Sequence, residues 1–428
     1  MDFGSLAKET KLKKADLIIF SDTILTCRGN GRPKILAEMN DTGVIRNGCI
    51  AVKDGRIAAV GVRNKIVKVF SPEKAASVIE AGPYVVMPGF IDSHTHPVFA
   101  GSRVGEFIMR AQGATYQEIH EKGGGISFTV DNSVKASFEE LYKNGRAAIE
   151  RMIAHGTTVV EAKSGYGLSL EEELRQLRVI KKLAEDLPVD VISTFLGAHA
   201  VPRKYVDNRN EYVRIIIEEM LPAVKSENLA KFTDVFCEEG AFTLEETKKI
   251  LSAAASLGFK LKIHAEEFTN TGSAITAAEM GSVSADHLLR LTDQDIQKLA
   301  KTSTILTLMP GTLFFLGYNE YAPARRIIDL GAKVALATDY NAGSCLSASM
   351  QMAMSLACIK MKMTPEEAIN AATYNAAFAA DVQGEAGSIE EGKKADILIM
   401  NVEDYRMIPY HFGENLVKTV IKNGKVIV

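Results

Sequence analysis

The chain has 428 residues, of which 46% are hydrophobic, and its 50 basic and 53 acidic residues leave a formal net charge of −3. A chain of this length and composition can bury a large core, so we expect a globular protein. The balanced charge, without a basic run, argues against nucleic acid as a partner, and the absence of a long apolar stretch argues against a membrane.

The cysteines and the amino terminus bear on location. The five cysteines are scattered, odd in number and without the Cys-x-x-Cys spacing of thiolate zinc sites. Residues 1–14 are polar and contain no apolar segment of signal-peptide length. We therefore expect a reducing, cytoplasmic setting and no disulfide framework.

Short alternating strands are expected near both ends of the chain. They cover residues 16–25, 48–53, 56–62, 387–389, 395–400, 416–421 and 425–428. Asp54-Gly55 and Asn423-Gly424 are typical of tight hairpin turns. Because neither end is large enough to fold well alone, we expect the two ends to pair in one small β-sandwich.

Between these ends, strand-like and helix-like segments alternate. The expected strands cover residues 85–91, 157–162, 190–196, 232–236, 260–263, 282–285, 304–308 and 334–337. Eight alternations indicate an α/β fold of the (β/α)8 or TIM-barrel type. A doubly wound open sheet is the alternative, but no Gly-x-Gly-x-x-Gly follows any of these strands. We assign residues 1–84 and 381–428 to the sandwich and residues 85–380 to the barrel.

Two helix starts in this region carry capping-box patterns. Thr243 with Glu246, and Thr364 with Glu367, place a hydroxyl three residues before a carboxylate. Pro365 also occupies the first helical position, which proline favours. Both patterns predict that a helix begins at the following residue.

The most informative motif is His94-Thr95-His96, at the end of the first expected barrel strand. Side chains alternate along a strand, so the two imidazoles project from the same face and converge on one point. Such a pair is half of a metal site. Three further histidines also follow expected strands, namely His199, His264 and His287. The remaining three, interpreted as surface or packing residues, are His120, His155 and His411.

Polar side chains follow almost every expected barrel strand, where the chemistry of such barrels is located. They are Lys163, Ser164 and Tyr166, in the run Lys163-Ser164-Gly165-Tyr166, after the second strand, His199 after the third, Glu238 and Glu239 after the fourth, His264 and Glu267 after the fifth, Asp286 and His287 after the sixth, and Asp339 and Asn341 after the eighth. We therefore predict one polar site at this end of the barrel.

Four of these residues form a metal-ligand set: His94, His96, His264 and Asp339. Three imidazoles and one carboxylate suit Zn²⁺ or iron, as Fe²⁺ or Fe³⁺, and leave a position open for water. A bound divalent ion lowers the pKa of such a water from about 15.7 toward about 7, which makes hydroxide available at neutral pH. The set therefore predicts hydrolysis.

The motifs resemble those of the amidohydrolase superfamily and, more narrowly, those of its imidazolonepropionase branch in histidine degradation. The superfamily resemblance rests on the run from Pro88 to His96 with His264, His287 and Asp339. The narrower one rests on Gly101-Ser102-Arg103, Gly113-Ala114-Thr115-Tyr116, Lys163-Ser164-Gly165-Tyr166-Gly167, Gly197-Ala198-His199, His264-Ala265-Glu266-Glu267, the run from Thr338 to Ser344, and Pro409-Tyr410-His411-Phe412-Gly413. The similarity covers nearly the whole chain.

The resemblance implies cleavage of the ring amide of 4-imidazolone-5-propanoate by water, which gives N-formimidoyl-L-glutamate. Arg103 would bind the propionate through its planar guanidinium, with a further hydrogen bond from Tyr116. The other implied substrate-binding residues are Tyr166, His199, Glu267, Asn341, Gly343 and Ser344. The implied proton-transfer residues are Glu267, His287 and Asp339, and which of them activates the water is left open.

Several alternatives stay open at this point. Glu238 could bridge a second metal with His287, although we favour one metal because a second site would occupy groups that the substrate needs. A deaminase of a cyclic amidine or purine shares the same ligands, but a neutral heterocycle would not need Arg103. A third interpretation is a barrel that has lost catalysis and only binds a metabolite or a partner. We expect a small-molecule substrate, and a homodimer is one of the assemblies left open.

Overall fold

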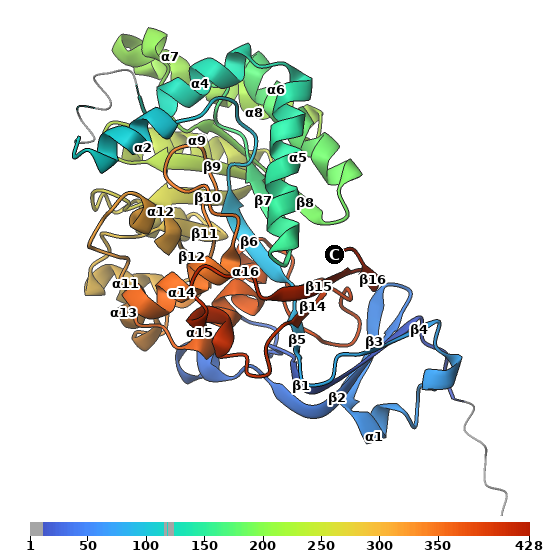
Figure 1. The fold of residues 1–428 in the computed structure, drawn as a ribbon. Helices are drawn as coiled ribbons and strands as arrows, with labels where there is room; N and C mark the ends of the chain where they lie inside the picture. Colours follow the sequence, from blue (N-terminus) through green and yellow to red (C-terminus); the bar gives the residue numbers. More distant parts are fainter. Residues whose placement is uncertain (1–11, 115–117, 119–123) are drawn as a thin grey trace, which may run out of the picture.

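The computed structural model describes residues 12–114, 118 and 124–428. Its central element is a sheet of eight parallel strands, ordered β13-β12-β11-β10-β9-β8-β7-β6 (Figure 1). The strands are β6 (Phe90–Thr95), β7 (Thr157–Lys163), β8 (Asp190–Ala198), β9 (Phe232–Cys237), β10 (Lys260–Ala265), β11 (Ser284–His287), β12 (Ile305–Leu308) and β13 (Lys333–Leu336). The predicted (β/α)8 barrel is confirmed.

The sheet closes between its first strand and the segment that follows its last strand. The Asp339 amide donates to the His94 carbonyl at 3.1 Å, and the His96 amide donates to the Tyr340 carbonyl at 2.8 Å. Beside this contact, the buried Asp92 carboxylate accepts from the Thr338 amide at 3.0 Å and from its hydroxyl at 2.5 Å. Closure excludes the open-sheet alternative.

The helices lie on the outside of the barrel, as Figure 1 shows. They are α2 (Val104–Ala111), α4 (Ile126–Lys135), α5 (Phe138–Ala154), α6 (Leu170–Asp186), α7 (Arg209–Ile215), α8 (Leu221–Ser226), α9 (Leu244–Ser256), α10 (Ser273–Glu279), α11 (Asp293–Leu299), α12 (Pro310–Phe315), α13 (Ala324–Asp329), α14 (Met350–Met361), α15 (Pro365–Ala372) and α16 (Tyr374–Ala379). Both predicted capping boxes are present, at the starts of α9 and α15.

One expected strand, residues 85–91, is divided in the structure. Val85–Pro88 forms β5, which belongs to the sheet of the chain ends, and β6 of the barrel starts at Phe90. The chain passes between the two sheets at Gly89, whose amide donates to the Asp396 carbonyl at 3.0 Å. A Cβ on Gly89 would lie 2.2 Å from the Thr158 hydroxyl oxygen, so only glycine fits this crossing.

The two chain ends pair as expected, and their strands join in one mixed sheet ordered β16-β15-β14-β5-β1-β2-β3, with β4 also pairing with β1. The strands are β1 (Leu17–Leu25), β2 (Val44–Lys53), β3 (Arg56–Val62), β4 (Ser77–Glu80), β14 (Ile397–Met400), β15 (Val417–Lys422) and β16 (Lys425–Val426). Isoleucines from both ends, among them Ile50 and Ile397, share one buried cluster. The division into residues 1–84, 85–380 and 381–428 stays a prediction.

Both predicted hairpin turns have left-handed backbone. Asp54 and Gly55 have φ values of 51° and 75°, and Asn423 and Gly424 have 49° and 73°. Asparagine, aspartate and glycine tolerate this conformation, which matches the twist of paired strands. Residues 387–389, which the structure describes, do not form the expected strand. The Ile389 amide instead donates one hydrogen bond to the Thr26 carbonyl, at 2.8 Å.

Each helix among the described residues is too short or too polar to cross a bilayer.

Lys422 links the chain-end sheet to the barrel. Its side chain is only 2% exposed, and its Nζ lies 2.6 Å from Asp396 and 2.7 Å from Asp190, which begins β8. Two carboxylates that converge on one buried ammonium need its charge, because an unpaired buried charge is costly.

We predict that Lys422→Met lowers the free energy of unfolding by about 3 kcal/mol, because it leaves the buried Asp396 carboxylate without its cation, whereas Asp190 keeps its ion pair with Lys394. Urea denaturation followed by circular dichroism measures the change. Lys425→Met, at an exposed lysine of the same hairpin, is the matched control. Equal stability of the two variants would show that the buried ammonium is dispensable.

Candidate metal centre and pocket

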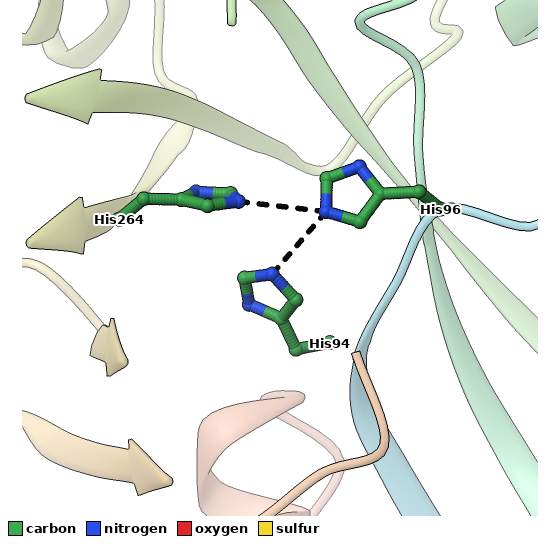
Figure 2. A group of neighbouring side chains, drawn as sticks. All are labelled: His94, His96 and His264. Atoms are coloured by element: carbon green, nitrogen blue, oxygen red, sulfur yellow. Dashed lines mark hydrogen bonds between the residues drawn. The ribbon is translucent and has the colours of Figure 1, made fainter. Parts of the chain in front are cut away.

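Three histidine side chains meet at the carboxyl end of the barrel strands (Figure 2). His94 lies in β6, His96 directly follows it, and His264 lies in β10. The Nε2 atom of His96 lies 3.3 Å from Nε2 of His94 and 3.4 Å from Nε2 of His264. The three nitrogens therefore converge on one point, as the His-x-His spacing predicts.

Asp339 adds an oxygen to this cluster. Its Oδ1 lies 3.6 Å from Nε2 of both His94 and His96. Its Oδ2 accepts from the Thr312 hydroxyl at 2.7 Å, which fixes the carboxylate. Burial raises the pKa of Asp339 to about 6. Asp339 also has a φ of 51°, a backbone conformation that costs energy in a residue with a Cβ and is held here by barrel closure.

Buried carboxylates orient two of the histidines. Asp286 lies 2.7 Å from Nδ1 of His94, and Asp234 lies 3.0 Å from Nδ1 of His264. A carboxylate accepts the Nδ1 proton and leaves the Nε2 lone pair free for a cation. Burial lowers the pKa of His94 well below its ordinary value, so its imidazole is neutral at pH 7.

The donor set fits a divalent metal ion. His94, His96 and His264 form one group of closely spaced ligand atoms, and His94, His287 and Asp339 form an overlapping one. Neutral imidazoles and a carboxylate are ligands of Zn²⁺ and of iron. The buried Nδ1 of His96 lacks a hydrogen-bond partner among the described residues, so His96 is held less firmly than His94 and His264.

Glu238 lies after β9, and the loop that follows β10 occupies its carboxylate. Its oxygens accept from the Phe268 amide at 2.8 Å, from the Thr269 amide at 3.2 Å and from the Thr269 hydroxyl. Glu238 is absent from the groups of ligand atoms found in the described residues. Its contacts give it a role in shaping this loop.

Lys163, which the sequence placed at a strand end, lies beneath the cluster and is fully buried. Its Nζ lies 2.8 Å from both Glu161 and Asp234. A second buried lysine, Lys262, lies 3.8 Å from Asp286. Each histidine-orienting aspartate therefore has its own cation, which offsets the cost of burying its charge.

A pocket opens above the cluster and brings most of the predicted residues together. Its lining consists of His96, Arg103, Arg110, Ile126, Tyr166, His199, Phe236, His264, Glu267, Phe268, His287, Leu316, Asp339, Asn341, Gly343 and Ser344. Tyr116 and His120 lie outside the described residues. His155 and His411 are not among the lining residues; each contacts a neighbour on its own segment, the Arg151 carbonyl and Glu414.

Two titratable residues after β10 and β11 face each other in this pocket. Nδ1 of His287 lies 3.7 Å from Oε1 of Glu267. Burial raises the pKa of Glu267 well above its ordinary value, and the nearby charges of Asp339 and Glu238 raise it further. Burial lowers the pKa of His287 well below its ordinary value. The pair combines a carboxyl group whose pKa is raised with a neutral imidazole.

Tyr166 and His199 are positioned by the turn that follows β7. The buried Glu173 carboxylate accepts from the amides of Gly165, Gly167 and Leu168, at 3.1, 2.8 and 2.8 Å. Nδ1 of His199 lies 3.0 Å from the Gly165 carbonyl, so this nitrogen carries a proton and Nε2 is an acceptor. Burial lowers the pKa of His199 to about 3, which keeps the ring neutral.

Arg103 and the turn after Asp339 meet at one side of the pocket. The Asn341 side-chain oxygen accepts from the amides of Gly343 and Ser344, both at 2.8 Å, and this builds the turn. A Cβ on Gly343 would lie 1.7 Å from Nη1 of Arg103. Arg103 also forms a two-point ion pair with Glu106, at 2.8 and 2.7 Å.

Sequence reasoning missed Asp234, Glu106 and Arg110. Asp234 could have been found, because it is a lone charge within the apolar run of β9. Glu106 follows Arg103 at the i,i+3 spacing that pairs side chains at a helix start. Arg110 carries no comparable signal, because the sequence does not show which face of α2 turns toward the barrel.

Comparisons with known proteins agree with this geometry. The model of the amidohydrolase family matches residues 85–427. An imidazolonepropionase of Alkaliphilus oremlandii is 47% identical over 405 residues, which cover 95% of this chain and 96% of that protein. An imidazolonepropionase of Geobacillus sp. (strain WCH70) is 49% identical over 397 residues, which cover 92% of this chain and 93% of that protein.

Solved structures share the fold at low sequence identity. An adenosine deaminase from Xanthomonas campestris with bound zinc has a TM-score of 0.71 and 18% identity, covering 97% of this chain and 93% of that chain. A triazine hydrolase variant has a TM-score of 0.75 and 16% identity, covering 96% of this chain and 94% of that chain. The chain therefore belongs to the amidohydrolase family, in the branch that contains the imidazolonepropionases.

Proposed function

We propose that the chain hydrolyses the ring amide of 4-imidazolone-5-propanoate to N-formimidoyl-L-glutamate, a step of histidine degradation. Water adds to the ring carbonyl carbon, the carbon–nitrogen bond breaks, and the leaving nitrogen takes up a proton. The observation that carries this proposal is a single pocket that combines the cluster of His96, His264 and Asp339 with the guanidinium of Arg103. The curated relatives support the same reaction.

His94, His96, His264 and Asp339 would hold one divalent metal ion, zinc or iron, and we favour one because Glu238 is engaged by its own loop. When bound, such an ion acts as a Lewis acid and lowers the pKa of water. Asp339 can also accept a proton from the attacking water, since its pKa of about 6 makes it a stronger base than an exposed aspartate.

We assign Glu267 and His287 to proton transfer. Glu267 has a raised pKa, and a base becomes more effective as its pKa approaches the working pH. His287 lies close enough to exchange a proton with it after a small movement. We propose that His199 contacts the imidazolone ring, because its Nε2 can accept a hydrogen bond from a ring N–H group. Since Nε2 carries no proton in this tautomer, His199 cannot donate a hydrogen bond that would polarise the ring carbonyl.

Tyr166, Asn341, Gly343 and Ser344 would contact the substrate or the opened product, and Arg103 would hold the propionate together with Tyr116. A deaminase acting on a neutral heterocycle has less support, because among the described residues Arg110 has no carboxylate partner and a neutral substrate would supply none. A cytoplasmic location and a homodimer stay predictions.

We predict one metal ion per chain in the purified protein and in Glu238→Gln, because this carboxylate binds the loop amides and hydroxyl of residues 268–269. Elemental analysis of both proteins measures the stoichiometry. Asp339→Asn is the comparison variant and should reduce the metal content, because a neutral amide binds the ion more weakly. Two ions in the parent and one in Glu238→Gln would establish a bridged pair instead.

We predict that Glu267→Gln lowers kcat by about 10²-fold or more, because the amide keeps the size of the side chain but cannot accept a proton. Metal content should equal that of the parent, since Glu267 is outside the ligand set. Glu239→Gln, at an exposed glutamate of a neighbouring loop, is the control. Loss of metal from Glu267→Gln would make Glu267 a ligand, and near-normal kcat would move proton transfer to His287 or Asp339.

We predict that Gly343→Ala lowers kcat/KM by about 10- to 100-fold, because the added Cβ displaces the Arg103 guanidinium from the pocket wall. Steady-state kinetics with enzymatically generated substrate measure the loss. Gly105→Ala is the matched control, since a Cβ at Gly105 meets nothing within 4 Å. Equal activity of the two variants would mean that Arg103 does not act from its observed position.

A further inference from the structure

Arg103 does not bring a free positive charge to the pocket. Its Nε and Nη2 donate to the two oxygens of Glu106 at 2.8 and 2.7 Å, and the two side chains are 12% and 9% exposed. The Glu106 carboxylate also accepts from the Gly125 amide at 3.0 Å, which holds it in place. A two-point pair of this kind is strong and nearly neutral as a unit.

Arg110 is a second guanidinium on the same wall of the pocket. It lies in the last turn of α2, two turns after Arg103. Its Nη2 lies 3.3 Å from the Gly343 carbonyl, so both arginines contact the same glycine. The buried Nε of Arg110 has no hydrogen-bond partner, and no carboxylate pairs with Arg110 among the described residues.

Among the residues that the structure describes, the two guanidiniums therefore share one carboxylate, Glu106, which pairs with Arg103. Burial lowers the pKa of Arg110, and repulsion from Arg103 lowers it further, against the weaker attraction of Glu106. Arginine nevertheless stays protonated in proteins, so the uncompensated charge persists at Arg110. A cation that is partly buried with an unused donor is stabilised when an anion binds beside it.

We propose that Arg110 supplies the positive charge that selects a substrate with a carboxylate, and that Arg103, neutralised by Glu106, mainly orients that carboxylate. This inference rests on the proposed function, because the anion it needs is the propionate of the imidazolone. It makes Arg110 the specificity-determining residue for the acidic side chain of the substrate.

The test compares 4-imidazolone-5-propanoate with its neutral propanamide analogue. The parent should prefer the acid, and Arg110→Met should lower kcat/KM for the acid by about tenfold or more while changing that for the amide by less than about threefold. Arg110→Lys should keep most of the preference, since it retains the charge. Arg178→Met, at an exposed arginine paired with Glu227 outside the pocket, is the control.

A second substitution removes the charge of Glu106, the counterion of Arg103. Glu106→Gln frees the charge of Arg103, so adding it to Arg110→Met should restore part of the lost preference for the acid. Equal loss for acid and amide in Arg110→Met, or an unchanged preference in that variant, would overturn the inference. So would equal loss of the preference in Arg110→Lys and Arg110→Met.

Direct binding separates this inference from the proposed function. Calorimetric titration with 3-(imidazol-4-yl)propanoate and with its amide needs no turnover. If the parent does not hydrolyse the imidazolone but binds this acid more tightly than the amide, and Arg110→Met loses that difference, the proposed function fails and the role of Arg110 stands. If the parent hydrolyses the imidazolone and Arg110→Met binds the acid as tightly as the parent does, the proposed function stands and the role of Arg110 fails.

Discussion

The backbone contact that closes the barrel also assembles the candidate metal centre. Hydrogen bonds between Asp339 and His94, and between His96 and Tyr340, join the first strand to the segment after the last one. Three of the four residues in these bonds belong to the ligand cluster. A barrel that failed to close would leave Asp339 far from both histidines, so folding and site formation depend on the same contact. The strained φ of Asp339 is consistent with a residue fixed on both sides by this closure.

Closure places several charges in a dry interior, and the structure offsets them in pairs. Asp286 lies between His94 and Lys262, and Asp234 lies between His264 and Lys163. Each carboxylate thus meets an imidazole on one side and an ammonium on the other, which limits the desolvation cost and fixes the tautomer of the ligand. Such an interior gives up apolar packing energy, and the result is a pair of imidazoles that are already oriented before any cation arrives.

The sequence allowed prediction of the barrel, of the paired chain ends and of the convergence of three histidines and Asp339, because each depends on local periodicity. His94 and His96 share a face by the alternation of a strand, and parallel strands bring His264 and Asp339 to the same end. The lysine and aspartate partners depend on which strands are neighbours and on side-chain direction inside the barrel, which no local pattern gives. The same limit explains Gly89: one apolar run serves two sheets, and only the tertiary structure shows where it changes from one to the other.

The charges of the pocket wall connect the fold to the choice of substrate. Near the cluster, the Asp339 carboxylate favours a divalent cation, and that cation would leave little negative charge for the rest of the pocket to balance. Farther along the lining, Arg103 pairs with Glu106, whereas Arg110 pairs with no carboxylate of the described part of the chain. A neutral ring amide beside the cluster, joined to a carboxylate beside Arg110, matches this distribution. A neutral heterocycle of similar size would fill the end of the pocket beside the cluster and leave the Arg110 guanidinium desolvated and unpaired. Discrimination against such a neutral substrate therefore comes from the free-energy cost of that unpaired charge.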